Sequence, residues 1–521
     1  MLNLPIKILD RHVTPAGGEA NLTFAGIDDL VAQWDALKGL TSRHLVLIVN
    51  ASSEDVGDYW DLGVRPNGSA VADKEYQAGL GSGAGASTGR ITGSSAWTCG
   101  RCIPAGNYPD AFGGVVLLIP HAFNTTNHKN ALLLGGAAEH AVNMAVFRWP
   151  HTDAITSLYL YIGGTFTANS KFLLGVIDES YLVEEIEDAA ADFSPTWNIP
   201  QGEGDLITIG YLRSDQAAVE DEVLHTINDD TTAANYPAQE LTGRAAVFAA
   251  ASPVNQEIGM VSGDNATALV FGPLVAVYSQ YTKQNQQHYL SLSGYVESSG
   301  PTSEIRLMSG RRDNVEPINK LALSPNAGTD FKAGSLFSLY RVPKRLIDRQ
   351  VLTVDTATIT FNNIPQYYEA LQLHVYARTD NGANPRDSVL VSFNNDLVVA
   401  NYNEQELAGF VAAVLASRNI SRAAMMVAGD IAAVGVFGGG SIMMPGYART
   451  DGHKHRVNLS GAAENIVRVY SSHWEDSSPI TRIDLAPGAG ANFLAGSVFE
   501  LEGVLRKEGL PADAGMSVGI P

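Results

Sequence analysis

The sequence predicts an all-β fold of three tandem β-sandwich, jelly-roll-like modules, with one short helical insertion in the first module. Three observations predict it. A length of 521 residues fits three or four domains of roughly 150 residues each. One pattern of landmarks recurs three times along the chain. Within each copy, short apolar segments alternate with a period of two between turn residues, which is typical of sandwiches and jelly rolls.

The end of each module carries the clearest copy of the repeat. Two phenylalanines stand six positions apart, at Phe166 and Phe172, with a small residue and a serine between them. The same pattern recurs at Phe331 and Phe337, and at Phe493 and Phe499. Because an even spacing places both side chains on one face of an extended chain, we expect both rings of each pair to face a core.

Other landmarks recur in the same order along the chain. They are Ile199-Pro200-Gln201 with Ile364-Pro365-Gln366, Asn235-Tyr236 with Asn401-Tyr402, Gln239-Glu240-Leu241 with Gln405-Glu406-Leu407, His128-Lys129 with His453-Lys454, and Trp149 with Trp474. They predict modules over residues 15–180, 181–345 and 346–507, with an N-terminal arm over residues 1–14 and a flexible tail over residues 508–521. The acidic, alanine-rich residues 178–193 read as a solvated linker.

Individual strands follow from alternation. Residues 206–211, 371–376 and 389–393 alternate apolar and polar side chains, and residues 483–485 and 498–501 are short strands on either side of a Pro-Gly-rich turn. Residues 27–37 instead space their apolar side chains for one face of a short helix. The corresponding stretch of the third module is shorter, so the helix is an insertion in the first.

Composition limits the classes of function. The chain has 34 Lys and Arg against 55 Asp and Glu, a formal net charge of −21. Such a surface disfavours nucleic-acid backbones and anionic membranes as partners. No apolar run approaches the ~20 residues of a membrane span. The N-terminal segment lacks the features of a signal peptide, so we expect synthesis in a cytoplasm. Two cysteines exclude a disulfide framework.

Three features invite a chemical interpretation, and each has a simpler structural one. Cys99 and Cys102 are spaced like a redox pair but lie in a Gly/Ser-rich context, where a local turn is the expectation. His453 and His455 could offer two imidazoles to a metal, although a solvated strand end is the default. A glutamate recurs once per module, at Glu139, Glu297 and Glu464, and is expected to bind turn amides.

Common catalytic motifs are missing from the sequence, including the nucleophile elbow, the phosphate-binding loop and the zinc-protease helix. We therefore expect a protein that is not an enzyme, with no catalytic residue, no metal site and no cofactor.

The module ends carry a family resemblance. Residues 479–504 contain a strand with Ile483, a Pro-Gly turn and the pattern Phe-x-x-Gly-Ser-x-Phe-x-Leu, which resembles the closing segment of β-sandwich modules in virion proteins of tailed bacteriophages. Residues 318–342 are similar, and residues 155–177 less so, because Asn169 replaces the glycine. The resemblance implies a structural role in a tail, baseplate or capsid decoration, and it carries no catalytic residue.

From these points we expect a virion structural protein that is made in the host cytoplasm, is associated with a tail or fibre or exposed on the particle, and acts in assembly and host-surface attachment. Capsid decoration is one alternative and a carbohydrate-binding adhesin another. The expected partners are other virion proteins, copies of the chain and a host-surface glycan, with no nucleic acid and no membrane insertion. The modules would stand in series as an elongated spacer, with the arm docking onto a neighbour. Tyr59, Trp60 and Trp97 are the candidate ligand or partner surface.

Overall fold

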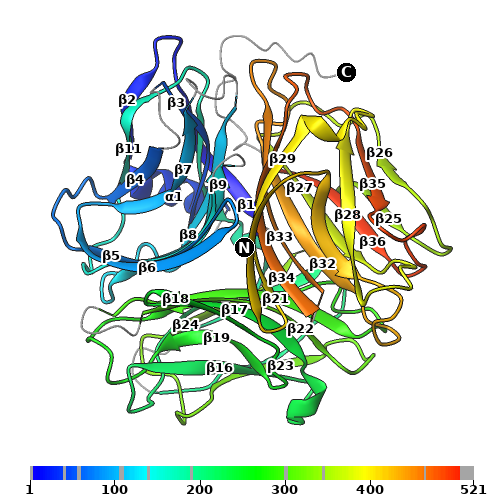
Figure 1. Ribbon diagram of the computed structural model, residues 1–521. Coiled ribbons are helices and arrows are strands. Elements are labelled where there is room, and N and C mark those ends of the chain that lie inside the picture. The colour runs from blue at the N-terminus through cyan, green and yellow to red at the C-terminus, as the bar shows by residue number, and fades with distance from the viewer. Residues whose placement is uncertain are drawn as a thin grey trace.

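The computed structural model is almost entirely β, as the sequence predicts (Figure 1). It describes residues 4–38, 43–54, 60–104, 111–137, 141–187, 192–297, 303–342, 346–462 and 465–504. In these residues each module contributes twelve strands. The predicted helix is present as α1 (Ile27–Lys38), between the second and third strands of the first module. Its apolar side chains, among them Ile27, Val31 and Trp34, are buried against that module.

The strands of the three modules are as follows. Module 1 contains β1 (Ile6–Val13), β2 (Glu19–Ala25), β3 (Leu45–Ser53), β4 (Trp60–Pro66), β5 (Lys74–Ser82), β6 (Gly85–Ser94), β7 (Trp97–Pro104), β8 (Gly113–Ile119), β9 (Lys129–Ala137), β10 (Ala141–Trp149), β11 (Ser157–Phe166) and β12 (Lys171–Ile177). Module 2 contains β13 (Leu182–Glu187), β14 (Thr196–Asn198), β15 (Asp205–Leu212), β16 (Glu220–Ile227), β17 (Ala238–Arg244), β18 (Val247–Ala251), β19 (Glu257–Ser262), β20 (Gly272–Tyr278), β21 (Gln287–Tyr295), β22 (Glu304–Arg312), β23 (Lys320–Pro325) and β24 (Leu336–Val342). Module 3 contains β25 (Leu346–Val351), β26 (Ile359–Phe361), β27 (Ala370–Ala377), β28 (Arg386–Phe393), β29 (Tyr402–Phe410), β30 (Ala413–Ile420), β31 (Ala423–Ala428), β32 (Gly438–Pro445), β33 (Lys454–Ala462), β34 (Ile466–Trp474), β35 (Ile483–Pro487) and β36 (Val498–Val504). Short 3₁₀ turns lie at η1 (Glu179–Tyr181), η2 (Ala233–Asn235) and η3 (Val399–Asn401).

Each module is a sandwich with the same topology. In module 2 an eight-stranded sheet, β13-β24-β15-β20-β21-β22-β17-β18, packs on a four-stranded sheet, β14-β23-β16-β19. Module 3 repeats both orders strand for strand. Module 1 has the same two sets, but a short parallel pairing of β3 with β7 joins them into one twelve-stranded sheet. We call the eight-stranded set of each module its inner sheet and the four-stranded set its outer sheet.

The phenylalanine pairs lie where the spacing predicts. All six rings are buried, and each pair meets edge to face with centroids 4.8–4.9 Å apart. The small residue between them has a positive φ, at Gly334 (87°), Gly496 (92°) and Asn169 (65°). Asparagine tolerates this left-handed conformation better than other non-glycine residues do. This explains why the first copy keeps the turn without the glycine.

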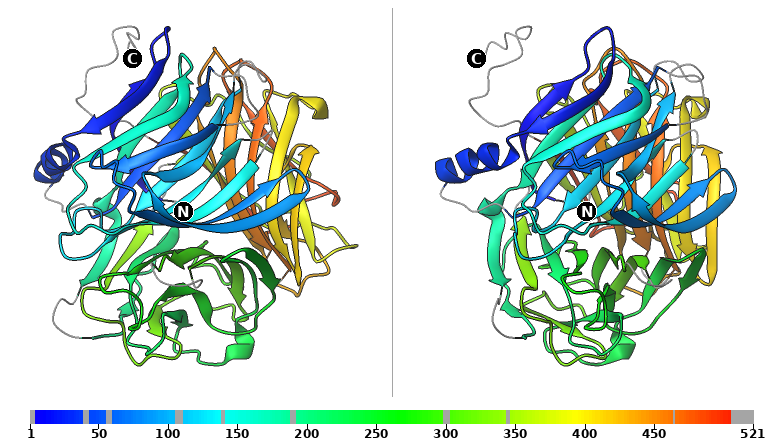
Figure 2. Two further views of the ribbon diagram at one scale, coloured as in Figure 1. Left: turned by 60° about the vertical axis from the view of Figure 1, so that its left-hand side comes forward. Right: turned by 90° about the vertical axis from the view of Figure 1, so that its left-hand side faces the viewer.

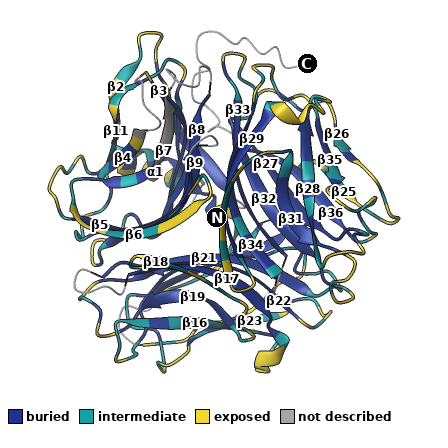
Figure 3. Cartoon of the chain, viewed as in Figure 1, coloured by how far each residue is buried: buried dark blue, intermediate teal, exposed yellow. Residues whose placement is uncertain are grey.

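The three inner sheets face one another across a common apolar core, and the modules do not stand in series. Figure 1 shows them arranged around a centre, and Figure 3 shows dark, buried strands meeting there. This core combines side chains of all three modules, for example Ile48, Leu292 and Leu459. Each sandwich also has an apolar core of its own. The expectation of an elongated spacer is therefore wrong.

The N-terminal segment is not a free arm. Residues Ile6–Val13 form β1, which pairs antiparallel with β12 at the edge of the inner sheet (Figure 2). The expected linker over residues 178–193 likewise contains β13, which pairs with β24 in the equivalent position. Each segment forms the edge strand of its inner sheet, and its backbone groups complete the eight strands. The tail over residues 508–521 lies outside the described residues.

Candidate functional site: the contacts that join three modules

Three equivalent glutamines connect the modules in a ring. Gln77, Gln239 and Gln405 occupy the same position on β5, β17 and β29, and all three side chains are fully buried. Each Nε2 donates to a backbone carbonyl in a hairpin turn of another module. Gln77 binds Ala245 of module 2 at 3.1 Å, and Gln239 binds Val411 of module 3 at 3.0 Å. Gln405 binds Gly83 of module 1 at 3.0 Å and so closes the ring.

The accepting residues are equivalent to one another and share an unusual backbone conformation. Gly83, Ala245 and Val411 have φ values of 56°, 48° and 50° in the turns β5–β6, β17–β18 and β29–β30. Only glycine adopts this region without strain, and a β-branched side chain is the least suited to it. The glutamine bond therefore holds a strained turn against the adjacent module in two of the three places.

A second set of contacts repeats around the same centre. Gly136, Gly294 and Gly461 are equivalent on β9, β21 and β33, and each lies against β10, β22 or β34 of another module. A methyl group on Gly136 would come within 2.8 Å of Ser471 Cβ, and one on Gly294 within 3.0 Å of Val146 Cγ1. One on Gly461 would collide with Ser309. The glycines are required because the sheets approach too closely for a side chain.

Ion pairs also join the modules, but unlike the glutamine contacts they do not occupy equivalent positions. At least one ion pair spans each pair of modules: Arg43 with Glu185 at 3.2 Å, Arg349 with Glu203 at 2.8 Å, and Lys171 with Glu369 at 2.5 Å. The first two pairs are partly exposed, and ion pairs near a surface contribute little stability, whereas Lys171 and Glu369 are mostly buried. The apolar core and the buried glutamines therefore hold the ring together, and the rim charges favour one pairing of modules.

Replacing Gln405 with alanine is expected to destabilise the chain by about 3 kcal/mol. The substitution removes the bond to the Gly83 carbonyl and a second bond, at 3.0 Å, from the Gly83 N–H to Oε1. Two half-buried backbone groups of Gly83 then lack their protein partner, at ~1–3 kcal/mol each. Urea denaturation followed by tryptophan fluorescence measures the change. Gln216→Ala, at a half-buried glutamine outside the ring, is the control. Equal stability of the two variants would argue against the role of the glutamine.

Val411→Gly is expected to stabilise the chain by roughly 1 kcal/mol, because glycine removes the strain at φ 50° and Val411 is already 47% exposed. Val399→Gly provides the contrast. Val399 is similarly exposed, at 45%, but lies in η3 and is not among the residues with positive φ. There the added backbone freedom should lower stability. Thermal denaturation would detect both shifts, and a loss of stability in Val411→Gly would show that the turn is not strained.

Of the three residues predicted as a ligand surface, only Trp97 has a described side chain, and it is not on the surface. Trp97 is completely buried, and its Nε1 donates to the Arg148 carbonyl at 3.2 Å. Its ring packs against Phe147 with centroids 5.6 Å apart, so it cannot offer a face to a ligand. Trp60 begins β4, but its side chain lies outside the described part of the chain, as does all of Tyr59.

Cys99 and His455, for which the sequence suggested a chemical role, lie in surroundings that fit a structural role. Burial raises the pKa of the Cys99 thiol well above its usual value, which makes the thiol unreactive. The side chain of Cys102 is outside the described residues. His455 is buried and hydrogen-bonds to Ser471 Oγ at 2.9 Å. Within the described ranges, no group of three or more His, Cys, Asp or Glu side chains is placed to hold a metal ion.

The recurring glutamate has the predicted role where it can be seen. Glu297 is buried and accepts a bond from the Thr267 backbone N–H at 2.6 Å. The equivalents Glu139 and Glu464 lie outside the described residues.

Comparison with known proteins does not identify a family. No family model matches the chain, and no curated protein matches it. Among solved structures, an exo-inulinase from Aspergillus awamori has 8% identity and a TM-score of 0.21, covering 94% of this chain and 84% of its own. CghA has 9% identity and a TM-score of 0.11, with coverages of 91% and 98%. Such low scores carry no argument about fold or function. In the described part of the chain, no helix is long and apolar enough to cross a membrane.

Proposed function

We propose that this chain is a non-enzymatic structural protein of a tailed-bacteriophage particle, and that it caps a position of threefold symmetry on the capsid. The observation that supports this proposal is the closed ring of three equivalent glutamine contacts, at Gln77, Gln239 and Gln405. Proteins that assemble by repeated head-to-tail contacts close into rings when the rotation permits. Here one chain contains the whole ring of three equivalent modules. Its approximate threefold symmetry would match a site on a capsid where three neighbouring subunits meet.

The compact ring favours a capsid cap over a tail or fibre segment. A fibre gains length from modules placed in series, whereas here the inner faces of all three modules are used against one another. The outer sheets and the loops remain for neighbours. The resemblance of residues 479–504 to modules of virion proteins supports a place on a phage particle. The net charge of −21 suits an exposed position in contact with cationic neighbours.

Electron cryo-microscopy of particles from the source culture, combined with immunogold labelling against the chain, tests the proposal. A capsid cap predicts label over the head and one three-lobed density at threefold or local threefold positions. Label confined to one end of the particle would contradict the capsid cap and indicate a tail component instead. Particles without label, when the same antibody binds the free protein, would refute the virion role and leave the adhesin alternative.

A further inference from the structure

Module 1 contains an open groove at a place that side chains fill in the described parts of the other two modules. It has a volume of about 300 Å³ and lies between strands β5, β6 and β10 of the inner sheet and β4 and β7 of the outer one. Tyr76, Leu80 and Ile91 give it an apolar wall, and Asp61, Thr98 and Asn143 contribute polar groups. Its size is at the lower end of pockets that hold small molecules.

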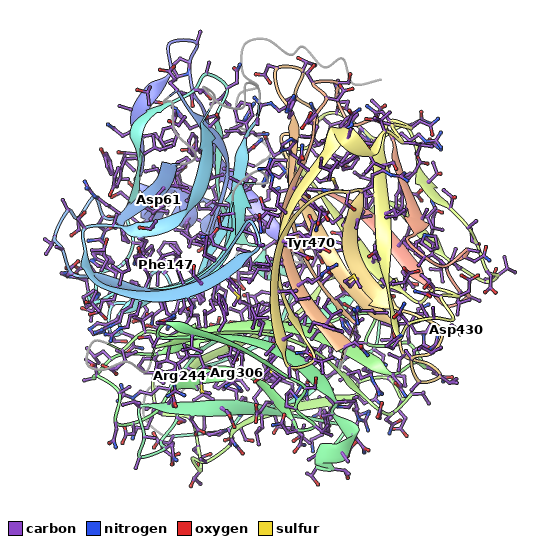
Figure 4. All side chains as sticks on the ribbon, viewed as in Figure 1. Asp61, Phe147, Arg244, Arg306, Asp430 and Tyr470 are labelled. Carbon is purple, nitrogen blue, oxygen red and sulfur yellow. The ribbon has the colours of Figure 1, made fainter. Side chains whose placement is uncertain are left out.

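In module 2 the equivalent space is filled by a buried arginine and its carboxylates. Arg306 on β22 corresponds to Asn143 on β10, because Arg306 pairs with Thr242 and Ser293 as Asn143 pairs with Leu80 and Gly135. The guanidinium lies 2.9 to 3.8 Å from four carboxylates, those of Glu304, Glu257, Glu240 and Glu222. Figure 4 shows Arg306 between the sheets of module 2 and Asp61 in module 1.

Module 3 fills the position in a simpler way. Arg468 on β34 is the residue equivalent to Arg306, and its Nη2 lies 2.5 Å from Glu406, which corresponds to Glu240. Two of the three modules thus close the end of the sandwich with an arginine and a glutamate on neighbouring strands.

Module 1 has lost this closure through substitutions at the same positions. Asn143 stands for the arginine, Ala78 for Glu240, Thr98 for Glu257 and Asp61 for Glu222, by strand pairing and chain position. The exchange removes three charged groups, keeps one carboxylate at Asp61 and shortens the side chains, and so opens the groove. It also leaves a buried acceptor without a partner. Asn143 is 7% exposed, and its Oδ1 makes no hydrogen bond in the described structure.

We propose that this groove binds a neutral, hydroxyl-rich ligand of the size of one saccharide unit. An apolar wall next to several hydrogen-bonding groups suits a sugar ring, which has an apolar face and a rim of hydroxyl groups. Among the described residues that line the groove none is Lys or Arg, and Asp61 repels anions. A cationic ligand is also disfavoured. In module 2 the buried Arg306 is surrounded by four carboxylates, whereas the described lining of the groove offers one, that of Asp61. Asn143 Oδ1 and Asp61 would accept bonds from ligand hydroxyls. This inference does not depend on the place of the chain on a particle.

Saturation-transfer NMR on the full chain tests the proposal, with D-glucose, D-galactose, N-acetyl-D-glucosamine and L-rhamnose as neutral probes. Glucose 6-phosphate and arginine amide are the charged probes. We expect transfer to at least one neutral sugar and at least tenfold less to either charged probe. The double variant A78E/N143R, which rebuilds the closure of modules 2 and 3, should reduce the sugar signal at least tenfold. The control A383E/N384R makes the same exchange at two exposed positions of a turn in module 3 and should retain it.

Asp61→Asn is a second test that does not depend on refilling the groove. Asp61 is exposed, so the variant is expected to fold, and the loss of a charged acceptor should weaken sugar binding about fivefold. The proposal is overturned if no neutral sugar shows transfer, or if a charged probe binds better. It is also overturned if a folded A78E/N143R variant binds as well as the control.

Discussion

Acidification from pH 7 to pH 4 is expected to unfold this protein and to separate its modules. Burial lowers the pKa of six histidines: to about 3 for His44, His121, His225 and His455, and to about 4 for His128 and His288. In the unfolded chain these imidazoles take up a proton below pH ~6.5, whereas the folded protein keeps them neutral. The stability that these histidines contribute is therefore complete above pH 6.5 and is lost as the pH falls toward 3 to 4.

The magnitude of this loss exceeds what opposes it. Each pKa unit of difference corresponds to about 1.4 kcal/mol, so one such histidine costs on the order of 3 kcal/mol at pH 4. Burial raises the pKa of Glu179 and Glu404 to about 8 and of Glu257 to about 7, and these groups have the opposite sign. They stabilise the fold as the pH falls from 8 toward 4.5 and change nothing below that. The histidines therefore dominate between pH 4.5 and 3.

Several of these histidines lie where modules meet. His44 of module 1 hydrogen-bonds to Ser338 of module 2 at 3.1 Å, and the His121 ring packs edge to face on Tyr211. His455 of module 3 lies against Gly114 of module 1, where an added methyl group would contact the imidazole. Protonation places charge in these buried contacts, and although Glu187 lies 3.5 Å from His121 Nε2, the burial penalty remains, so the ring should open before or together with the sandwiches.

An acid titration followed by circular dichroism and sedimentation measures this transition. The double variant His44→Gln/His121→Gln should move the midpoint of the transition to lower pH. Glutamine does not take up a proton in the unfolded chain, so two of the six sites that favour unfolding in acid are removed. His12→Gln, on the partly exposed edge strand β1, is the matched control and should leave the midpoint nearly unchanged. A fold that persists unchanged at pH 3.5 would contradict the assignment of neutral, buried imidazoles.

The sequence alone predicted the strands and the repeat but not how the modules meet. Alternation with a period of two indicates that one face of a strand is buried, but it does not say against which partner. One signal was available. Val115 to Ile119 is apolar without interruption, and such a run indicates burial on both faces. In the structure, Val115 and Leu117 face the core of module 1, whereas Val116 and Leu118 face the common core.

The glutamine ring was visible in part. The match of Gln239-Glu240-Leu241 with Gln405-Glu406-Leu407 marked two of its members. The third was missed because Gln77 is followed by Ala78 and Gly79. Those two changes belong to the opened groove and to the close approach of Phe248, whose ring a methyl group on Gly79 would meet. Divergence at a candidate binding site thus concealed the repeat that would have identified the ring.

A charge placed in the common core is expected to destabilise all three modules together. Val146 is fully buried on β10 and packs against Gly294 of module 2. Val146→Asp would bury a carboxylate in an apolar core and should cost at least ~4 kcal/mol. Val146→Ser should cost less, about 1–2 kcal/mol, because serine already occupies the equivalent positions 309 and 471.

Hydrogen exchange read by mass spectrometry distinguishes a shared core from three independent ones. If the core is shared, Val146→Asp should accelerate exchange in β20–β22 and β32–β34 as well as in β8–β10, because each set of strands lies in an inner sheet. Val247→Asp, on a side chain that is 66% exposed in β18, should leave all three sets protected. Faster exchange confined to β8–β10 would mean that the modules fold independently, and the ring of contacts would then be a docking arrangement between three complete domains.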